Sequence, residues 1–268
     1  MSLCKPRLKS LQDWVHNSVF QANLKEFKLT RILAIDTSTA WCSVALTLGD
    51  QTPILRHELV SAGASQLLLP WVETLLVKAD IQLKELDAIA VGIGPGAFTG
   101  VRLGVAAVQG LAVSCDLPVL PVTSLDAIAA QLIKTPDFVL AKPKNFVIAI
   151  DARMDEIYWA QYQSPVQQQD QAKRIGNIHL SKPEELDLTG IQFVAGSALK
   201  VYGDRLFSKT ALPLTALDSQ IHLTALGVLA CAEQGLREGR QINVHELEPL
   251  YVRDKVALTT QERLEAFK

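Results

Sequence analysis

Short apolar runs and longer helical segments alternate along the first half of the chain. Three apolar runs bounded by polar turns predict a β-meander, at Ile32–Asp36, Cys42–Leu48 and Ile54–Val60. The pattern that follows predicts a helix over about Ser65–Ala79, a strand over Ala88–Gly92, a helix over about Gly100–Cys115, a strand over Val119–Val122, and a helix capped by Thr123 or Ser124 that runs to about Lys134. Strands that alternate with helices indicate an α/β protein.

The pattern then begins a second time. VIAID at Val147–Asp151 repeats ILAID at Ile32–Asp36, and a second strand is expected at Glu156–Tyr162. Residues 32–48 align with residues 147–163 without a gap, which indicates a duplicated half. A later strand is expected at 191–194 and a helix at 223–237. Two halves of this kind, each with an Asp after its first strand, are typical of the actin-like ATPase fold, in which two mixed sheets carry helices on both faces.

These patterns divide the chain into three parts. Residues 1–30 form an N-terminal extension, 31–122 the first actin-like half with the partner-binding helices, and 123–268 the second half with the C-terminal segment. Within the extension, apolar residues at helical spacing leave open a short amphipathic helix or a loosely attached tail. A glutamine-rich stretch near residues 167–169 is expected to be a polar loop or a poorly ordered edge.

Charge and hydropathy narrow the class of partner. The chain has 26 Lys and Arg against 28 Asp and Glu, a net charge of −2, so we expect no strong direct binding of nucleic acid. Mean hydropathy is +0.18, which is high for a chain in which we find no run of the roughly 20 apolar residues that a membrane span needs. We therefore expect no membrane association, and apolar surface buried against another chain. Four scattered cysteines and the lack of a secretory pattern predict a cytoplasmic protein.

The most informative segment is the glycine-rich stretch between residues 92 and 104. Gly94, Pro95 and Gly96 predict a sharp reversal after a strand, and Thr99 is expected to cap a helix that begins at Gly100. Backbone N–H groups at such a helix start form an anion site by default. The stretch is neither a dinucleotide fingerprint, because Pro95 interrupts it, nor a phosphate-binding P-loop, because no lysine follows a glycine.

As a longer signature, the same stretch resembles a known family. GPGAFTGVRLG, preceded by ILAIDTSTAWCSVAL and followed by LPVTSLDAIA, is similar to the bacterial TsaB family, as are VIAIDARMDEIYWAQY and the C-terminal EPLYVRDKVA. The resemblance covers about residues 31–257. It implies the actin-like fold and a non-catalytic role, as the dimerisation subunit of the complex that attaches threonylcarbamoyl to adenosine 37 of tRNA. It further implies that the catalytic paralogue TsaD and the ATPase TsaE are partners. Since TsaD shares the fold, a homodimer and a heterodimer could use the same surface, and we expect a homodimer when the chain is alone.

A phosphate site remains open at the end of the first strand. In active members of the fold, phosphate and Mg²⁺ bind at the place of Asp36, Thr37, Ser38 and Thr39, and together with Gly94, Gly96 and Thr99 these residues are the candidate vestigial phosphate site. The alternative is that Asp36 and Thr39 only bind backbone groups of their own turn. The second half lacks small hydroxyl residues after Asp151. We expect no catalytic residue, no metal site and no cofactor, with weak or regulatory nucleotide binding left open.

Two of the expected helices, Ser65–Ala79 and Gly100–Cys115, carry apolar residues on all sides. This pattern is typical of helices that are buried on both sides. One hypothesis is that they pack on the sheet inward and on a partner outward; the other is that the second half of the same chain covers them. The expected interface residues are Leu68, Val72, Leu75, Leu76, Val101, Gly104, Val105 and Val108.

Two sets of side chains near the expected cleft leave alternatives open. Arg102 lies in the first helical turn, where a cation is disfavoured, so it either pairs with a carboxylate or a neighbouring chain or covers apolar surface with its stem. Tyr251 and Arg253 either contribute to function or dock the C-terminal segment on the body.

The competing functional class is a stand-alone actin-like ATPase or small-molecule kinase. A peptidase has no G-x-S-x-G motif behind it.

Overall fold

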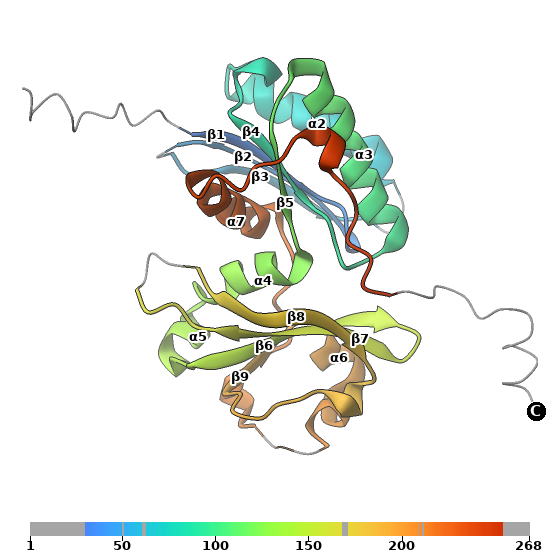
Figure 1. Ribbon diagram of the computed structural model, residues 1–268, viewed down its shortest axis with the longest axis vertical. Helices are drawn as coiled ribbons and strands as arrows, with labels where there is room; N and C mark the ends of the chain where they lie inside the picture. Colours follow the sequence, from blue (N-terminus) through green and yellow to red (C-terminus); the bar gives the residue numbers. More distant parts are fainter. Residues whose placement is uncertain are drawn as a thin grey trace, which may run out of the picture.

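The computed structural model describes residues 30–253, except 50, 61–62, 168–170, 209 and 211. The N-terminal extension, the centre of the glutamine-rich stretch and residues 254–268 lie outside the described residues. Two five-stranded sheets lie one above the other, with helices α4 and α7 between them (Figure 1). This is the duplicated actin-like α/β fold that the sequence predicts, with two mixed sheets and helices on both faces.

The first sheet has the strand order β3-β2-β1-β4-β5. Its strands are β1 (Arg31–Asp36), β2 (Trp41–Leu48), β3 (Ile54–Leu59), β4 (Ala88–Gly92) and β5 (Val119–Val122). The first three strands pair antiparallel, as expected of the meander, and β4 and β5 add parallel to β1. The interior of β1 and the whole of β4 are apolar because helices cover both faces of the sheet.

The second sheet repeats this arrangement in the order β10-β9-β6-β7-β8. Its strands are β6 (Asn145–Arg153), β7 (Glu156–Gln163), β8 (Lys173–Ser181), β9 (Phe193–Ala195) and β10 (Leu217–Asp218). The gapless alignment of the halves is wrong by one residue in the second strand. Ile35 pairs with Val44, but Ile150 pairs with Tyr158 rather than with Trp159, because the turn between β6 and β7 is tighter.

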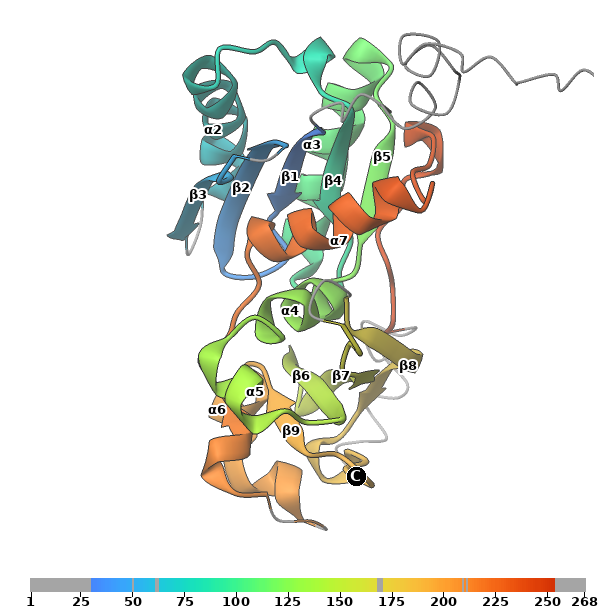
Figure 2. The ribbon, with the colours of Figure 1, turned by 90° about the vertical axis from the view of Figure 1, so that its left-hand side faces the viewer.

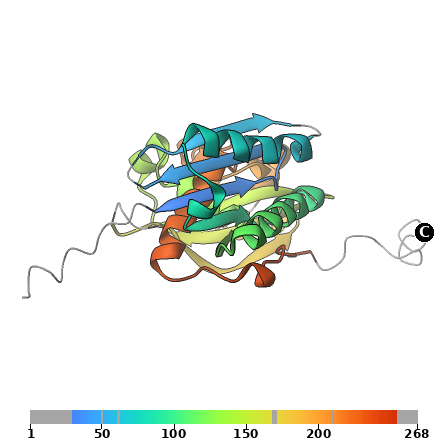
Figure 3. The same cartoon turned by 90° about the horizontal axis from the view of Figure 1, so that it is seen from above.

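The helices form three groups. Two cover the outer face of the first sheet, α2 (Ala64–Lys78) over β2 and α3 (Phe98–Cys115) over β4, and Figure 3 shows both from above. Two pack against each other between the sheets, α4 (Ser124–Leu132) and α7 (Ala225–Arg237) (Figure 2). The short helices α5 (Pro136–Ala141) and α6 (Ala198–Tyr202) belong to the second half.

The last part of the chain departs from the predicted division at residue 123. Helix α7 packs on β1, β2, β4 and β5 of the first sheet, so the chain returns to the first half after building the second. The apolar side of α7 includes Val228, Leu229 and Ala232, which join one core with residues of both sheets. A boundary drawn along the sequence therefore does not describe this segment.

Two cap predictions had different outcomes. Thr123 caps α4, since its Oγ1 accepts a hydrogen bond from the backbone N–H of Asp126 at 3.3 Å. The prediction for Thr99 is wrong, because α3 begins at Phe98 with Ala97 as its N-cap and no side chain caps it. Thr99 lies one residue inside the helix and is exposed.

Candidate functional site

The turn after β1 holds its polar side chains inside the protein. Asp36 is 1% exposed, Thr37 2% and Ser38 1%. The Asp36 carboxylate accepts hydrogen bonds from the backbone N–H of Ser38 at 3.1 Å and from its hydroxyl at 2.9 Å. The Thr39 hydroxyl oxygen accepts one from the N–H of Trp41 at 3.2 Å. Asp36 and Thr39 thus bind groups of their own turn, which is the alternative that the sequence left open.

The glycine-rich loop closes over this turn. The N–H of Ala97 donates to the carbonyl of Ser38 at 2.7 Å, and the Thr37 hydroxyl donates to the carbonyl of Gly100 at 2.6 Å. A Cβ at Gly96 or Gly100 would overlap the backbone carbonyls of the turn, so glycine is needed for this approach. The loop and the turn, predicted as two sides of a phosphate site, are brought together so closely that the chain itself fills the space.

Burial changes the protonation of Asp36. Desolvation raises the pKa of this carboxyl to about 7, and the hydrogen bonds from Ser38 oppose that shift only in part. The Ser38 hydroxyl also lies 3.2 Å from the Ser124 hydroxyl at the start of α4. The carboxyl is enclosed, so a hydrated Mg²⁺ could not reach it without displacing the groups that cover it.

The corresponding place in the second half is also held by protein groups. The Asp151 carboxylate accepts a hydrogen bond from the Tyr202 hydroxyl at 2.8 Å and one from the N–H of Arg153 at 2.9 Å. The backbone N–H of Asp151 donates to the Ser197 hydroxyl at 3.0 Å. Tyr202, on α6, was not anticipated from the sequence, because only the fold brings it to the end of β6. Among the described residues, no group of three or more His, Cys, Asp or Glu could hold a metal ion.

Beside the glycine-rich loop, the C-terminal segment lies across the first half. Arg102 Nε donates to the Tyr251 hydroxyl at 2.9 Å, and its guanidinium lies 3.7 Å from the centre of the Phe98 ring. Arg253 donates to the carbonyl of Ala152 at 3.0 Å and forms a 2.6 Å ion pair with Glu156 in the second half. The partner of Arg102 is therefore a tyrosine of its own chain, and Tyr251 and Arg253 dock the C-terminal segment on the body.

Seven of the eight interface residues expected on α2 and α3 are buried within the first half. Six of them lie in the apolar core of the first half, packed with Leu33 and Val91 of the sheet, namely Leu68, Val72, Leu75, Val101, Val105 and Val108. Gly104 is buried against Thr37, and Leu76 is half-buried. The prediction is wrong for the seven buried positions, because they form the inward stripe of helices that already cover a sheet, whereas Leu76 stays a candidate.

The outer faces of the same helices remain apolar. Leu69 is 51% exposed and Val77 74% on α2, while Val113 is 57% exposed on α3. Helix α3 is long and apolar enough to cross a membrane by length and composition, yet one side of it packs in the core of the first half and only 28% of the helix is buried overall. Ala106 and Gly110 also lie on the exposed side. The molecule thus presents an apolar helical surface to its surroundings.

The fold and the site together define an actin-like protein in which the glycine-rich loop covers the turn after β1. Residues 57–261 match the family model described as "TsaD: tRNA N6-adenosine threonylcarbamoyltransferase". The tRNA threonylcarbamoyladenosine biosynthesis protein TsaB of Haemophilus influenzae is 35% identical, over 84% of this chain and 94% of its own length. The protein of that name from Escherichia coli is 34% identical, over 85% and 96%.

Solved structures agree with the sequence relatives. A crystal structure from Pseudomonas aeruginosa, described as an uncharacterised protein with similarity to peptidase YeaZ, matches with a TM-score of 0.73 and 34% identity over 84% of this chain and all of that one. YeaZ from the same organism matches with a TM-score of 0.71 and 33% identity, over 83% of this chain and 99% of that one. The chain belongs to the TsaB family.

Proposed function

We propose that this chain is the non-catalytic dimerisation subunit of the assembly that forms N6-threonylcarbamoyladenosine at position 37 of tRNA. In this role it binds and supports the catalytic paralogue TsaD, the ATPase TsaE joins them, and the chain alone forms a homodimer in the cytoplasm. The observation that carries the proposal is membership of the TsaB family over 84% of the chain, with relatives named for this pathway. The shared fold of the two paralogues suits a pseudo-two-fold interface.

The closed loop supports a role without chemistry of its own. In a catalytic actin-like protein the turn after β1 has to meet phosphate. Here the carbonyl oxygen of Ser38 already accepts a hydrogen bond from the loop, and the carbonyl oxygen of Thr37 lies directly against Gly100. Opening that site would cost the hydrogen bonds between loop and turn and would expose Asp36. Weak or regulatory nucleotide binding elsewhere in the cleft remains part of the proposal.

The outer faces of α2 and α3 support the partner interface. We call this surface the outer helical face and define it by residues that are exposed or half-buried: Leu69, Leu76, Val77, Ala106, Gly110 and Val113. Small residues at Ala106 and Gly110 let a second helix approach closely. Nothing within 4 Å would meet a Cβ at Gly110, so this side of α3 is free of the chain's own atoms among the described residues.

Reconstitution tests the proposal directly. The full chain is mixed with TsaD, TsaE and a separate synthase that supplies threonylcarbamoyl-adenylate, and modified adenosine is counted by mass spectrometry. We expect modification to require this chain, and Ala106→Glu to abolish both homodimerisation in light scattering and capture of TsaD. Ala141→Glu makes the same substitution at an exposed position of α5 in the second half, away from α2 and α3, and should leave homodimerisation and capture of TsaD unchanged. Modification that proceeds unchanged without the chain would exclude the subunit role.

The alternative, a stand-alone ATPase or kinase, makes the opposite prediction. The isolated chain would bind nucleotide with Mg²⁺ tightly in calorimetry and would hydrolyse ATP. We expect neither, because Asp36 is buried beneath the glycine-rich loop.

A further inference from the structure

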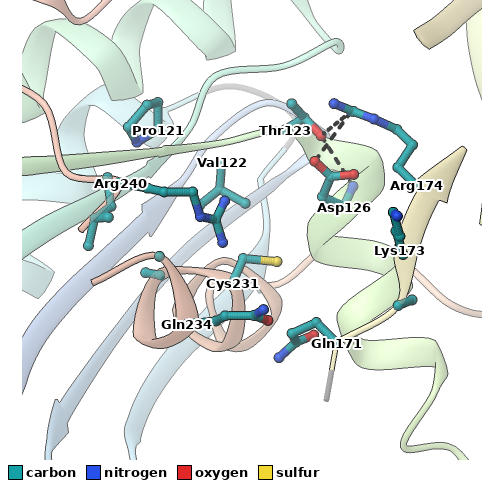
Figure 4. Close-up of a pocket in the computed structure, with 14 residues that line it drawn as sticks. Pro121, Val122, Thr123, Asp126, Gln171, Lys173, Arg174, Cys231, Gln234 and Arg240 are labelled. Atoms are coloured by element: carbon teal, nitrogen blue, oxygen red, sulfur yellow. Dashed lines mark hydrogen bonds and ion pairs between the residues drawn. The ribbon is translucent and has the colours of Figure 1, made fainter. Parts of the chain in front are cut away.

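A cavity of about 570 Å³ lies between the two halves, on the side of the β5 edge. Its walls come from β5 and the start of α4, from the C-terminal part of α7, and from the first residues of β8. Figure 4 shows Arg240 and Gln234 on one side of the cavity, with Gln171, Lys173 and Arg174 on the other. The volume falls within the range of about 300–1,000 Å³ typical of small-molecule sites.

The charges that line this cavity are predominantly positive. Lys173, Arg174 and Arg240 face one carboxylate, Asp126. That carboxylate accepts a hydrogen bond from the Tyr162 hydroxyl at 2.9 Å and forms an ion pair with Arg174 Nη1 at 3.3 Å, so Asp126 and Arg174 offset each other and the uncompensated positive charge comes from Lys173 and Arg240. Arg240 pairs through Nε with Glu238, which leaves its terminal nitrogens directed along the cavity (Figure 4). The cavity therefore favours an anion, and guanidinium groups suit the paired oxygens of a phosphate or carboxylate.

A second, independent feature is an unsatisfied amide. Gln171 Nε2 donates to the carbonyl of Ala230 at 3.3 Å, which fixes the side chain against α7. Its Oε1 atom is buried and has no hydrogen-bond partner among the described residues. A buried acceptor without a donor costs free energy, so a ligand that carries an N–H or O–H group here would relieve that cost.

The remaining wall of the cavity is apolar, and the cavity is far larger than an inorganic ion would fill. Leu120, Val122 and Ala232 contribute side chains to it, and the Cys231 thiol lies beside them. Burial raises the pKa of that thiol to about 12, so it stays neutral. A ligand with an anionic head, a hydrogen-bond donor and a flat apolar body matches all three properties.

We infer that this cavity binds a small organic phosphate of mononucleotide size, with its phosphate between Lys173 and Arg240. The site is separate from the closed glycine-rich loop and does not rest on the proposed scaffold role. Because the lining residues belong to both halves, a bound ligand would hold β8 against α7 and so restrain the movement of the second half relative to the first.

The test is calorimetric titration of the full chain with AMP, alongside adenosine, inorganic phosphate and a short single-stranded RNA. We expect AMP to bind more tightly than adenosine or inorganic phosphate, and the double variant Lys173→Gln/Arg240→Gln to weaken AMP binding at least about ten-fold. The matched variant Lys200→Gln/Arg237→Gln removes the same charges from exposed positions outside the cavity and should bind AMP unchanged. Hydrogen exchange should slow at residues 171–174 and 231–240 when AMP is present.

Several outcomes would overturn the assignment. They are no AMP binding at millimolar concentration, equal binding of AMP by the double variant and the wild type, and binding of AMP no tighter than that of adenosine or inorganic phosphate. Binding of RNA without AMP would assign the basic groups to a macromolecule and would equally contradict the proposal. Circular dichroism of both double variants checks that lost binding does not reflect lost folding.

Discussion

At Asp36 a single buried carboxyl makes stability depend on pH. Its pKa is raised from 3.8 to about 7 by burial, so the folded chain favours the protonated form. The contribution of this group is fully present below pH 3.8 and is lost as pH rises through about 7. We expect the wild type to lose about 2–3 kcal/mol of unfolding free energy relative to Asp36→Asn between pH 5 and pH 8.

Asparagine is the appropriate substitution because it resembles the protonated carboxyl. Its oxygen still accepts from the Ser38 N–H, and its neutral amide, like the protonated carboxyl, carries no charge for burial to penalise. Urea denaturation of both proteins at a series of pH values measures the effect, with stability differences taken pair by pair so that other titrating groups cancel. Parallel stability curves for the two proteins would show that Asp36 is ionised in the folded chain at neutral pH.

The closeness of loop and turn gives a second prediction at this scale. In Gly100→Ala the new methyl group meets the Thr37 carbonyl, which belongs to the backbone and cannot rotate away. Overpacking of this kind costs about 1–3 kcal/mol, which should lower Tm measurably in a thermal melt. Gly110→Ala lies in the same helix with open space around it, and removing a helical glycine there should raise stability by roughly 0.5–1 kcal/mol. Equal Tm values for the two variants would show that the loop at Gly100 does not contact the turn as closely as described.

At the scale of the element, neighbouring residues of α3 separate core from surface. Val105 is 3% exposed and packs in the core of the first half, whereas Ala106 is exposed. Val105→Glu should leave the chain unfolded, because it places an unpaired charge in that core. The milder Val105→Ala should cost roughly 2 kcal/mol in denaturant titration, whereas Ala106→Glu should leave the monomer as stable as the wild type within about 0.5 kcal/mol. A folded, monomeric Val105→Glu chain would restore the interface first expected at this position.

The same helices show what a sequence pattern can and cannot predict. The existence of α2 and α3 follows from their apolar period and length, and the core strands from runs such as Ile32–Ile35. The pattern does not say which side of a helix faces the sheet when Leu68 and Leu69 are alike in sequence. One is buried and the other half exposed only because of how α2 sits on β2.

Contacts between segments that are distant in the sequence could not be predicted from the sequence either. Arg102 meets Tyr251 across 149 residues, and Gln171 approaches α7 across 59. No local preference encodes such pairs, so the docked C-terminal segment and the inter-half cavity emerged only from the fold. The hydrogen bonds within the turn after β1 were partly predicted, since the binding of Asp36 and Thr39 to their own turn was one of two alternatives. The position of the loop above that turn, with Gly96 and Gly100 against its carbonyls, could not be predicted from the sequence.

At the scale of the whole molecule, the two halves meet through the crossing of α4 and α7. Gln131 on α4 accepts a hydrogen bond from the N–H of Thr224 at 3.0 Å and donates to the carbonyl of His222 at 3.2 Å. The N–H of Ala225 donates to the Ser43 hydroxyl on β2 at 2.8 Å. The start of α7 is thus tied both to the first sheet and to the helix that leads into the second, which makes this crossing the joint between the halves.

Gly227 sits where the two helices approach most closely, and its substitution tests the joint. A Cβ at Gly227 would overlap the carbonyl of Ala127 and the side-chain oxygen of Gln131, and the carbonyl cannot move without displacing α4. We expect Gly227→Ala to cost about 2 kcal/mol even after the gain in helix propensity, and to lower Tm by roughly 4–8 °C.

Because the two cores share this crossing, scanning calorimetry should show one broadened transition or two in place of a single one. Leu226→Ala, next to it on an exposed part of the helix, should keep the single transition. A Gly227→Ala protein with wild-type Tm would mean that α7 can shift freely on α4, and the halves would then be joined chiefly through the C-terminal contact of Arg253 with Glu156.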